Sequence, residues 1–211
     1  MARRKFGRLP RRSAPTRAPY SEFHIFVEGE VTECCYLKQI RRLIRSNLIE
    51  IHVYGAQGAP KTLVEAASQK SYELKRARRQ GPYEVWAVFD IDQHPRVSEA
   101  IVQANANNVG LCISDPCFEL WLVFHFRDYD APVDRRAIQR VLATHCSTYE
   151  RSGKEFSLKS CGGFSAEQLD AVAKACARAS AGKKRRDEEG GKRNPSTTCY
   201  RLVNRLCELG R

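Results

Sequence analysis

The sequence predicts an α/β protein with a parallel sheet, helices on both faces of the sheet and a helical C-terminal extension. Three observations lead to this prediction. Short apolar runs alternate with segments whose apolar residues recur at helical spacing, as in proteins built from strand–helix–strand units. With 42% apolar and 28% charged residues, the chain has enough apolar side chains for a packed core. Its 211 residues fit one domain with an appendage.

Strands and helices alternate through the first half of the chain. Phe23 to Val27 is a short aromatic and β-branched run that ends at a glutamate–glycine turn, as a buried strand would. The next segment carries apolar residues on one helical face and basic residues on the other. Breaks at Gly55 and at Gly81-Pro82 separate further units of the same kind. We predict strands over residues 23–27, 48–54, 84–89 and 111–114, and helices over residues 31–47, 60–80 and 96–107.

We predict that the second half of the chain is mainly helical. Residues 117–126 are apolar almost throughout and follow a proline, which is tolerated in the first turn of a helix, so we predict a buried helix there. Asn194, Ser196 or Thr197 is available to cap the last helix. We predict further helices over residues 134–149, 165–180 and 196–209, and a charged, glycine-containing loop over residues 183–193.

The predicted elements divide the chain into three parts. Residues 1–21 form a basic, flexible N-terminal arm, residues 22–128 form the sheet-containing core, and residues 129–211 form a mainly helical extension packed on that core. We find no internal repeat.

Positive charge dominates the composition, with 36 basic residues against 24 acidic ones and a net charge of +12. Such an excess favours a polyanionic partner, either nucleic acid or an anionic membrane surface. Residues 1–20 contain seven basic residues and no acidic one. This arm fits a solvated extension, a leader or a nucleic-acid-binding arm. An organelle transit peptide fits less well, because the arm lacks an amphipathic pattern and contains prolines.

Basic side chains also gather on the outer faces of two predicted helices and in the charged loop. Because such surfaces follow the phosphate backbone of a nucleic acid, we assign these residues to substrate binding. They are Arg41 and Arg45 on the first helix, Lys75, Arg78 and Arg79 near the end of the second, and Lys183, Lys184, Arg185 and Arg186 in the loop.

The sequence also argues against export and membrane insertion. No stretch approaches the roughly 20 apolar residues that a membrane helix requires, and the N-terminus lacks the apolar centre of a secretion signal. The nine cysteines form no C-x-x-C pair, so a zinc ribbon or a thioredoxin-type motif is excluded and reduced thiols are expected. We therefore expect a cytoplasmic protein without a membrane partner.

Acidic residues follow the predicted strands at the points where the chain leaves the sheet. Glu28 ends the first strand, Asp90 and Asp92 end the third, and Asp115 follows the fourth. Ligands of an open parallel sheet bind outside the carboxyl ends of its strands, so these carboxylates are expected at one rim. Gathered negative charges require a compensating cation, and carboxylate oxygens suit Mg²⁺ or Mn²⁺. We predict that Asp90, Asp92, Glu28 and Asp115 bind such a metal.

Two further residues are assigned to catalysis. His94 follows the acidic pair closely and is either a metal ligand or an acid–base group, although a loop histidine is often simply exposed. Glu119 lies in an otherwise apolar helix, where an unpaired carboxylate is costly. It therefore either pairs with an arginine or points at the rim. An acid at the end of a strand, taken singly, is commonly a helix cap or a turn residue.

Four segments of the chain resemble the RloB family, in the family's order and across residues 24–203. The third segment is long and unusual, which makes the resemblance specific. The segments are residues 26–36, with FVEGEVTE followed by Tyr36; residues 85–95, VWAVFDIDQHP; residues 114–126, with SDPCFELWL followed by His125 and Phe126; and residues 194–198, NPSTT.

The resemblance implies a Toprim-like core, the metal-binding fold shared by topoisomerases, bacterial primases and several nucleases. It implies that Glu28 acts as acid or base in phosphodiester chemistry and that Asp90 and Asp92 bind the metal. Gly29 is expected to keep the turn open for a phosphate, and Glu33 is placed with the substrate-binding residues. Two positions depart from the family: Asp115 stands where asparagine is common, and Ile91 stands where a charged residue is frequent.

The family is associated with bacterial restriction and abortive-infection loci, often beside an ATPase gene. The resemblance therefore implies a Mg²⁺-dependent or Mn²⁺-dependent nuclease that acts as a toxin effector of antiphage defence, together with an ATPase partner. RNA, including tRNA, is favoured over DNA as substrate, and a homo-oligomer is allowed. The alternative is a non-catalytic nucleic-acid-binding or regulatory subunit of a defence complex. Strand synthesis or rejoining is disfavoured, because no domain remains for a template clamp or a tyrosine nucleophile.

Overall fold

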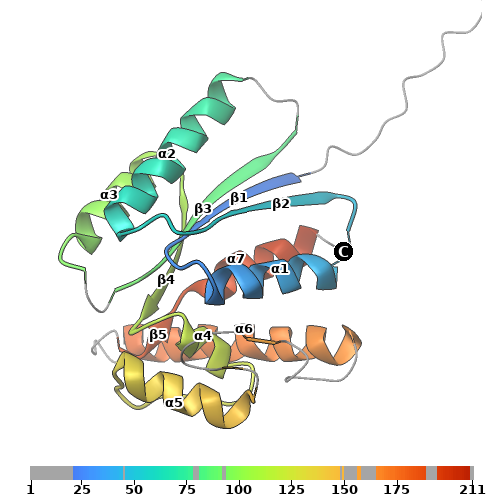
Figure 1. Ribbon diagram of the computed structural model, residues 1–211, viewed down its shortest axis with the longest axis vertical. Helices are drawn as coiled ribbons and strands as arrows, with labels where there is room; N and C mark the ends of the chain where they lie inside the picture. Colours follow the sequence, from blue (N-terminus) through green and yellow to red (C-terminus); the bar gives the residue numbers. More distant parts are fainter. Residues whose placement is uncertain are drawn as a thin grey trace, which may run out of the picture.

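The computed structural model describes residues 21–44, 46–77, 81–91, 94–147, 149, 156–157, 165–188 and 194–209 (Figure 1). The predicted N-terminal arm therefore lies outside the described residues, apart from Ser21. Asp92, Arg45, Arg78 and Arg79 lie outside them as well.

The centre of the molecule is a five-stranded sheet in the order β2-β1-β3-β4-β5. Four strands are parallel, and the short fifth strand runs antiparallel to β4. The predicted α/β fold class is confirmed. The strands are β1 (Ser21–Val27), β2 (Ile49–Tyr54), β3 (Tyr83–Asp90), β4 (Gly110–Asp115) and β5 (Ser196–Thr197).

The order of the strands creates a switch point between β1 and β3. From β1 the chain first crosses to β2 on one side and then returns to β3 on the other side. At such a point the connections leave in opposite directions, and a crevice opens beyond the carboxyl ends of the two strands. Glu28 and Asp90 stand at these two carboxyl ends.

Helices cover both faces of the sheet, as Figure 1 shows. Helices α2 (Pro60–Arg76) and α3 (Val97–Ala106) pack on the face that carries Phe26 and Phe89. Helices α1 (Thr32–Ile44) and α7 (Cys199–Leu209) pack on the face that carries Ile25 and Val88. Side chains along each strand alternate between the two faces, so a central strand feeds two separate apolar cores.

Three more helices complete the second face. Helix α4 (Glu119–Val123) is buried at every residue and lies beside α5 (Arg135–His145) and α6 (Ser165–Glu188). The predicted buried helix is therefore present, although its regular part is shorter than residues 117–126. The helices predicted over 134–149 and 165–180 are also present, with different ends.

The prediction of a loop over residues 183–193 is wrong for its first part, because α6 continues to Glu188. Ion pairs one helical turn apart support this extension. Lys183 Nζ lies 2.7 Å from the Asp187 carboxylate, and Lys184 Nζ lies 3.7 Å from that of Glu188. The charged residues and the glycines suggested a loop, but Asp187 and Glu188 each follow a lysine by four residues, which is helical spacing. Residues 189–193 lie outside the described residues.

The last helix begins at Cys199 and not at Ser196, because the preceding residues form β5. Ser196 and Thr197 pair with the end of β4. Of the residues expected to cap the helix, Thr197 takes part: its hydroxyl accepts a hydrogen bond from the Cys199 N–H at 3.2 Å.

Two expectations from composition can be compared with the described residues. None of the helices in the described ranges is long and apolar enough to cross a membrane. The eight cysteines among the described residues are free thiols, as predicted, and most of them are buried.

Candidate active site

The candidate site is built where β1 and β3 end side by side. The ladder between them continues one step past β1, because the Glu28 N–H donates to the Val88 carbonyl at 3.2 Å. The Glu28 carboxylate then turns across to β3 and accepts a hydrogen bond from the Asp90 N–H at 3.3 Å on Oε2. The sequence prediction that Glu28 and Asp90 meet at one rim of the sheet is thus confirmed.

His94 joins this pair from the loop after β3. The Ile91 N–H donates to the Ser114 carbonyl at 3.0 Å, and the His94 N–H donates to the Ile91 carbonyl at 3.4 Å. These bonds fix Ile91 and His94 beside the ends of the strands, and His94 Nε2 lies 3.0 Å from Glu28 Oε1. Both side chains are about one-quarter exposed, at 25% and 24%. The pair is therefore accessible to a ligand, and its geometry fits an acid–base pair.

Asp90 lies deeper, with only 7% of its side chain exposed. Its Oδ2 accepts a hydrogen bond from the Arg135 guanidinium at 3.0 Å. The pKa of Asp90 is nevertheless raised well above its usual range, first by burial and then by the neighbouring charge of Glu33. Arg135 opposes this rise, while Glu119 and Glu28 add to it. Negative charge around Asp90 therefore exceeds what one guanidinium compensates.

Glu33 occupies the first turn of α1 and is buried. Its carboxylate packs against the turn after β1 so closely that a Cβ on Gly29 would lie 2.5 Å from Glu33 Oε2. Burial raises the pKa of Glu33, and the charges of Glu119 and Glu28 raise it further. Gly29 is thus required by the carboxylate of Glu33. The expected phosphate contacts of Gly29 and Glu33 stay predictions.

Glu119 is the fourth carboxylate and is buried at the start of α4. Its Oε1 accepts hydrogen bonds from the Tyr149 hydroxyl at 2.7 Å and from Gln139 Nε2 at 3.1 Å. These uncharged donors hold the side chain, in place of the arginine that was one of the two sequence interpretations. Its charge acts on Asp90 and Glu33, so Glu28, Glu33, Asp90 and Glu119 form one acidic group.

The remaining predicted ligands are placed differently. Asp92 lies outside the described residues. Asp115 is the last residue of β4, one step beyond Ser114, which is the partner of Asp90 in the ladder. Because side chains alternate along a strand, Asp115 belongs to the face opposite to Asp90. Its role as a metal ligand stays a prediction, and this placement does not favour it.

The chemistry of the acidic group fits a divalent cation. Glu28, Glu33, Asp90 and Glu119 bring carboxylates together, and two of them have raised pKa values because of burial and mutual repulsion. Hard carboxylate oxygens with too little compensating charge are the donors that Mg²⁺ and Mn²⁺ prefer. Among the described residues, no three of these acids lie close enough together to form a complete set of metal ligands. The predicted set also includes Asp92, which lies outside the described residues.

The predicted substrate-binding cations are spread over the surface. Arg41 and Lys75 are exposed on α1 and α2. The four basic residues near the end of α6 all have acidic partners. Lys183 pairs with Asp187, Lys184 with Glu188, and both Arg185 and Arg186 with Asp130. Their assignment to substrate binding stays a prediction, and a nucleic acid would have to displace these acids.

Sequence reasoning missed Arg135, Gln139 and Tyr149. All three lie in the helical extension, and they contact the acidic group from α5 and the segment after it. Asp134 caps α5 by accepting a hydrogen bond from the Ala137 N–H at 2.8 Å, which fixes the first turn where Arg135 stands. The sequence contains no signal that would single out this arginine among its basic neighbours.

The fold and the site together define a Rossmann-like α/β protein with an acidic group of several carboxylates at the switch point of its sheet. The chain belongs to the family described as RloB-like protein, whose model matches residues 23–206. This match confirms the resemblance found in the sequence. Comparison with curated proteins and with solved structures gives no match.

Proposed function

We propose that this chain is a metal-dependent nuclease with a Toprim-like active site, which cleaves phosphodiester bonds in RNA in preference to DNA. The observation that carries the proposal is the acidic group at the switch point. The charges of Glu28, Glu33 and Glu119 act on the buried Asp90, which pairs with one guanidinium. Glu28 and His94 form the accessible edge of the group. A site with excess negative charge repels a polyanionic substrate unless a divalent cation is bound.

A divalent cation, when bound, supplies electrostatic stabilisation of the charge that develops on the phosphate. Asp90 and the predicted ligand Asp92 would hold it, with Glu28 beside them. Glu28 then accepts the proton of the attacking water, because its carboxylate is the exposed one in the group. The Asp90 N–H and His94 hold both oxygens of Glu28 and so fix its orientation. In this scheme His94, beside Glu28, supplies a proton to the leaving oxygen.

A hollow beside His94 offers a place for the substrate backbone. It has a volume of about 280 Å³ and lies between the start of α2 and the loop before α3. Its lining includes Lys61 and Arg96, and the N–H groups at the first turn of α2 add partial positive charge. A phosphate next to the one being cleaved would find these groups within reach of the Glu28–His94 pair.

The wider role that we propose follows from family membership. RloB-like proteins are associated with restriction and abortive-infection loci, so we infer a toxin effector of antiphage defence that acts with an ATPase partner. The preference for RNA, including tRNA, rests on the analogy that such toxins often stop translation. Sequencing RNA and DNA ends from cells that express the chain, with and without the neighbouring ATPase gene, would identify the substrate.

The activity is tested by incubating the full chain with mixed RNA and DNA substrates in Mg²⁺, in Mn²⁺ and in a chelator. Glu28→Gln and Asp90→Asn should each lower cleavage by about 100-fold or more, the scale of a lost general base or metal ligand. Glu30→Gln is the matched control, because Glu30 is exposed in the same turn, and this variant should keep full activity. Cleavage that survives the chelator or both substitutions would overturn the proposal. Metal-dependent binding without cleavage would favour the alternative of a regulatory subunit.

A further inference from the structure

A second group of potential metal ligands lies on the sheet away from the acidic group. Glu22 and His24 follow one another on the same side of β1, and His52 is the partner of His24 in the parallel ladder with β2. These residues stand toward the amino ends of their strands, whereas Glu28 and Asp90 lie at the carboxyl ends. The two groups are therefore separate sites, near opposite ends of β1.

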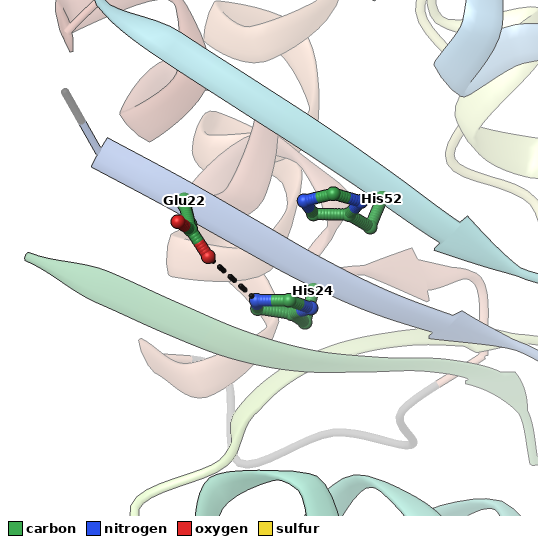
Figure 2. Close-up of side chains that lie close together, drawn as sticks. All are labelled: Glu22, His24 and His52. Atoms are coloured by element: carbon green, nitrogen blue, oxygen red, sulfur yellow. Dashed lines mark hydrogen bonds and ion pairs between the residues drawn. The ribbon is translucent and has the colours of Figure 1, made fainter. Parts of the chain in front are cut away.

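The donor atoms of this group are already gathered. One ligand atom from each of Glu22, His24 and His52 lies within 4.8 Å of the others, which holds for no other three such residues in the described ranges. His24 Nε2 lies 3.3 Å from Glu22 Oε2. The two imidazole rings are stacked at 4.7 Å between centroids, and Figure 2 shows the Glu22 carboxylate directed at the edge of the His24 ring.

His24 is oriented as metal-binding histidines usually are. Its other ring nitrogen, Nδ1, lies 3.1 Å from the Tyr54 hydroxyl, so Tyr54 can accept the Nδ1 proton and leave Nε2 free as a donor to an ion. Such an outer partner fixes the tautomer and the ring orientation of a ligand histidine. Glu22 and His24 are both buried, and their side chains are thus held in place before any ion binds.

The charges near the group favour a cation. Glu22 and, next to His52, Glu50 supply two carboxylates, with Glu50 Oε1 at 3.5 Å from His52 Nε2. The opposing positive charge that acts on His24 comes from Lys70 on α2.

We propose that Glu22, His24 and His52 form a binding site for a transition-metal ion of the Zn²⁺ class, with a water molecule as fourth ligand. Two imidazoles and one carboxylate suit Zn²⁺ and not Mg²⁺, which takes oxygen ligands. The site links the central strand β1 to the edge strand β2 at the end of the sheet remote from the acidic group. Its role is to fix that edge.

The geometry needs one adjustment. Donors that bind one tetrahedral Zn²⁺ at about 2.0–2.1 Å lie roughly 3.3 Å apart. Glu22 and His24 already have this separation, at 3.3 Å. His52 has to turn its ring out of the stack with His24, and the 37% exposure of its side chain leaves room for this movement. The same exposure gives the ion an entry path.

The test is to measure metal binding by the full chain. Calorimetric titration gives the affinity and thermal unfolding gives the shift in Tm, each with Zn²⁺ and, separately, with Mg²⁺. Zn²⁺ at 100-fold over its Kd should raise the Tm by about 5–10 °C, whereas Mg²⁺ should not reproduce the effect through this group. His52→Ala is the decisive variant, since the side chain is 37% exposed and its removal should leave the fold intact. It should weaken Zn²⁺ binding by about 100-fold or more, and Tyr54→Phe by about 10-fold, the scale of a lost outer partner.

Two controls distinguish this site from other histidines and from the thiols. His145→Ala removes an exposed histidine on α5 and should leave Zn²⁺ affinity unchanged. Co²⁺ substituted into the site should give a spectrum of nitrogen and oxygen ligands without a thiolate charge-transfer band. Zn²⁺ affinity that is unchanged in His52→Ala, or a thiolate band that persists, would overturn the proposal. Either result leaves the nuclease proposal intact, because that proposal is tested at Glu28 and Asp90.

Discussion

The Arg135 guanidinium lies 3.0 Å from the Asp90 carboxylate, at the position in the acidic group where positive charge is most needed. The arginine comes from α5 in the helical extension, and the aspartate ends β3 in the sheet. In this arrangement the guanidinium does part of what a divalent cation would do, because it compensates a buried carboxylate that three other acids repel. Arg135 and a metal ion are therefore competitors for the same charge.

The first prediction follows from this competition. Arg135→Gln should bind Mn²⁺ about tenfold more tightly than the wild type, because a nearby positive charge no longer repels the ion. Without metal, the same variant should lose about 1–3 kcal/mol of unfolding free energy, less than a fully buried pair because Arg135 is 29% exposed. Arg136→Gln, exposed on the same helix, is the control for calorimetric titration and denaturant unfolding. Weaker Mn²⁺ binding by Arg135→Gln would show that the arginine supports the metal instead.

The second prediction concerns Gly29. A Cβ at this position would meet Glu33 Oε2 at 2.5 Å, so Gly29→Ala should displace the carboxylate and lower the unfolding free energy by about 1–3 kcal/mol. The loss should shrink in a Glu33→Ala background, which a double-mutant cycle of chemical denaturation would measure. Gly182→Ala in α6 is the control, because nothing lies within 4 Å of a Cβ there and alanine should stabilise the helix by about 0.5–1 kcal/mol. Equal effects of the two substitutions would contradict the close approach.

The third prediction tests how Glu119 is held. Tyr149→Phe removes the 2.7 Å hydrogen bond to a buried carboxylate and should cost about 1.5–3 kcal/mol of unfolding free energy. Tyr200→Phe provides the comparison, since Tyr200 is half-buried on α7 and its ring contacts Arg201. A Tyr149→Phe protein as stable as the wild type would mean that Glu119 does not depend on this donor.

The fourth prediction concerns pH. His125 is buried, its Nδ1–H donates to the Trp121 carbonyl at 3.1 Å, and its Nε2 accepts from the Tyr36 hydroxyl at 3.2 Å. Burial lowers the pKa of His125 to about 4, below the value of about 6.5 in the unfolded chain. The unfolded chain therefore takes up the proton first, and this contribution to stability is lost as pH falls from about 6.5 to about 4.

The loss should be on the order of 3 kcal/mol. Unfolding measured across this pH range should show it in the wild type and not in His125→Gln. The exposed His145, replaced by Gln, should leave the pH dependence as in the wild type. A pH profile shared by all three proteins would rule out a neutral, buried His125.

The meeting of Glu28 and Asp90 was predictable because a parallel sheet brings the carboxyl ends of its strands to one edge. Strand alternation with helices was enough to place them. Arg135 was not predictable, because it contacts Asp90 across 45 residues of sequence, and that contact depends on how α5 packs against α4. A local sequence pattern predicts which face of a helix is apolar. It does not predict which of several arginines will contact a buried acid.

The group of Glu22, His24 and His52 was not predictable from the sequence for a related reason. Glu22 and His24 are two residues apart, so they share one face of any strand. His52 joins them only because β1 and β2 pair in a register that sets His24 against His52. Alternation along a strand shows which residues share a face, but it does not show which residue of β2 stands opposite His24.

The last strand protects one edge of the sheet. Thr197 and Thr198 close the free edge of β4: the Thr198 hydroxyl accepts from the Ile113 N–H at 2.9 Å, and the Thr197 hydroxyl meets that of Ser114 at 2.9 Å. A strand edge with unpaired backbone groups can pair with the edge of a sheet in another chain. By occupying this edge, the two threonines guard the protein against edge-to-edge aggregation.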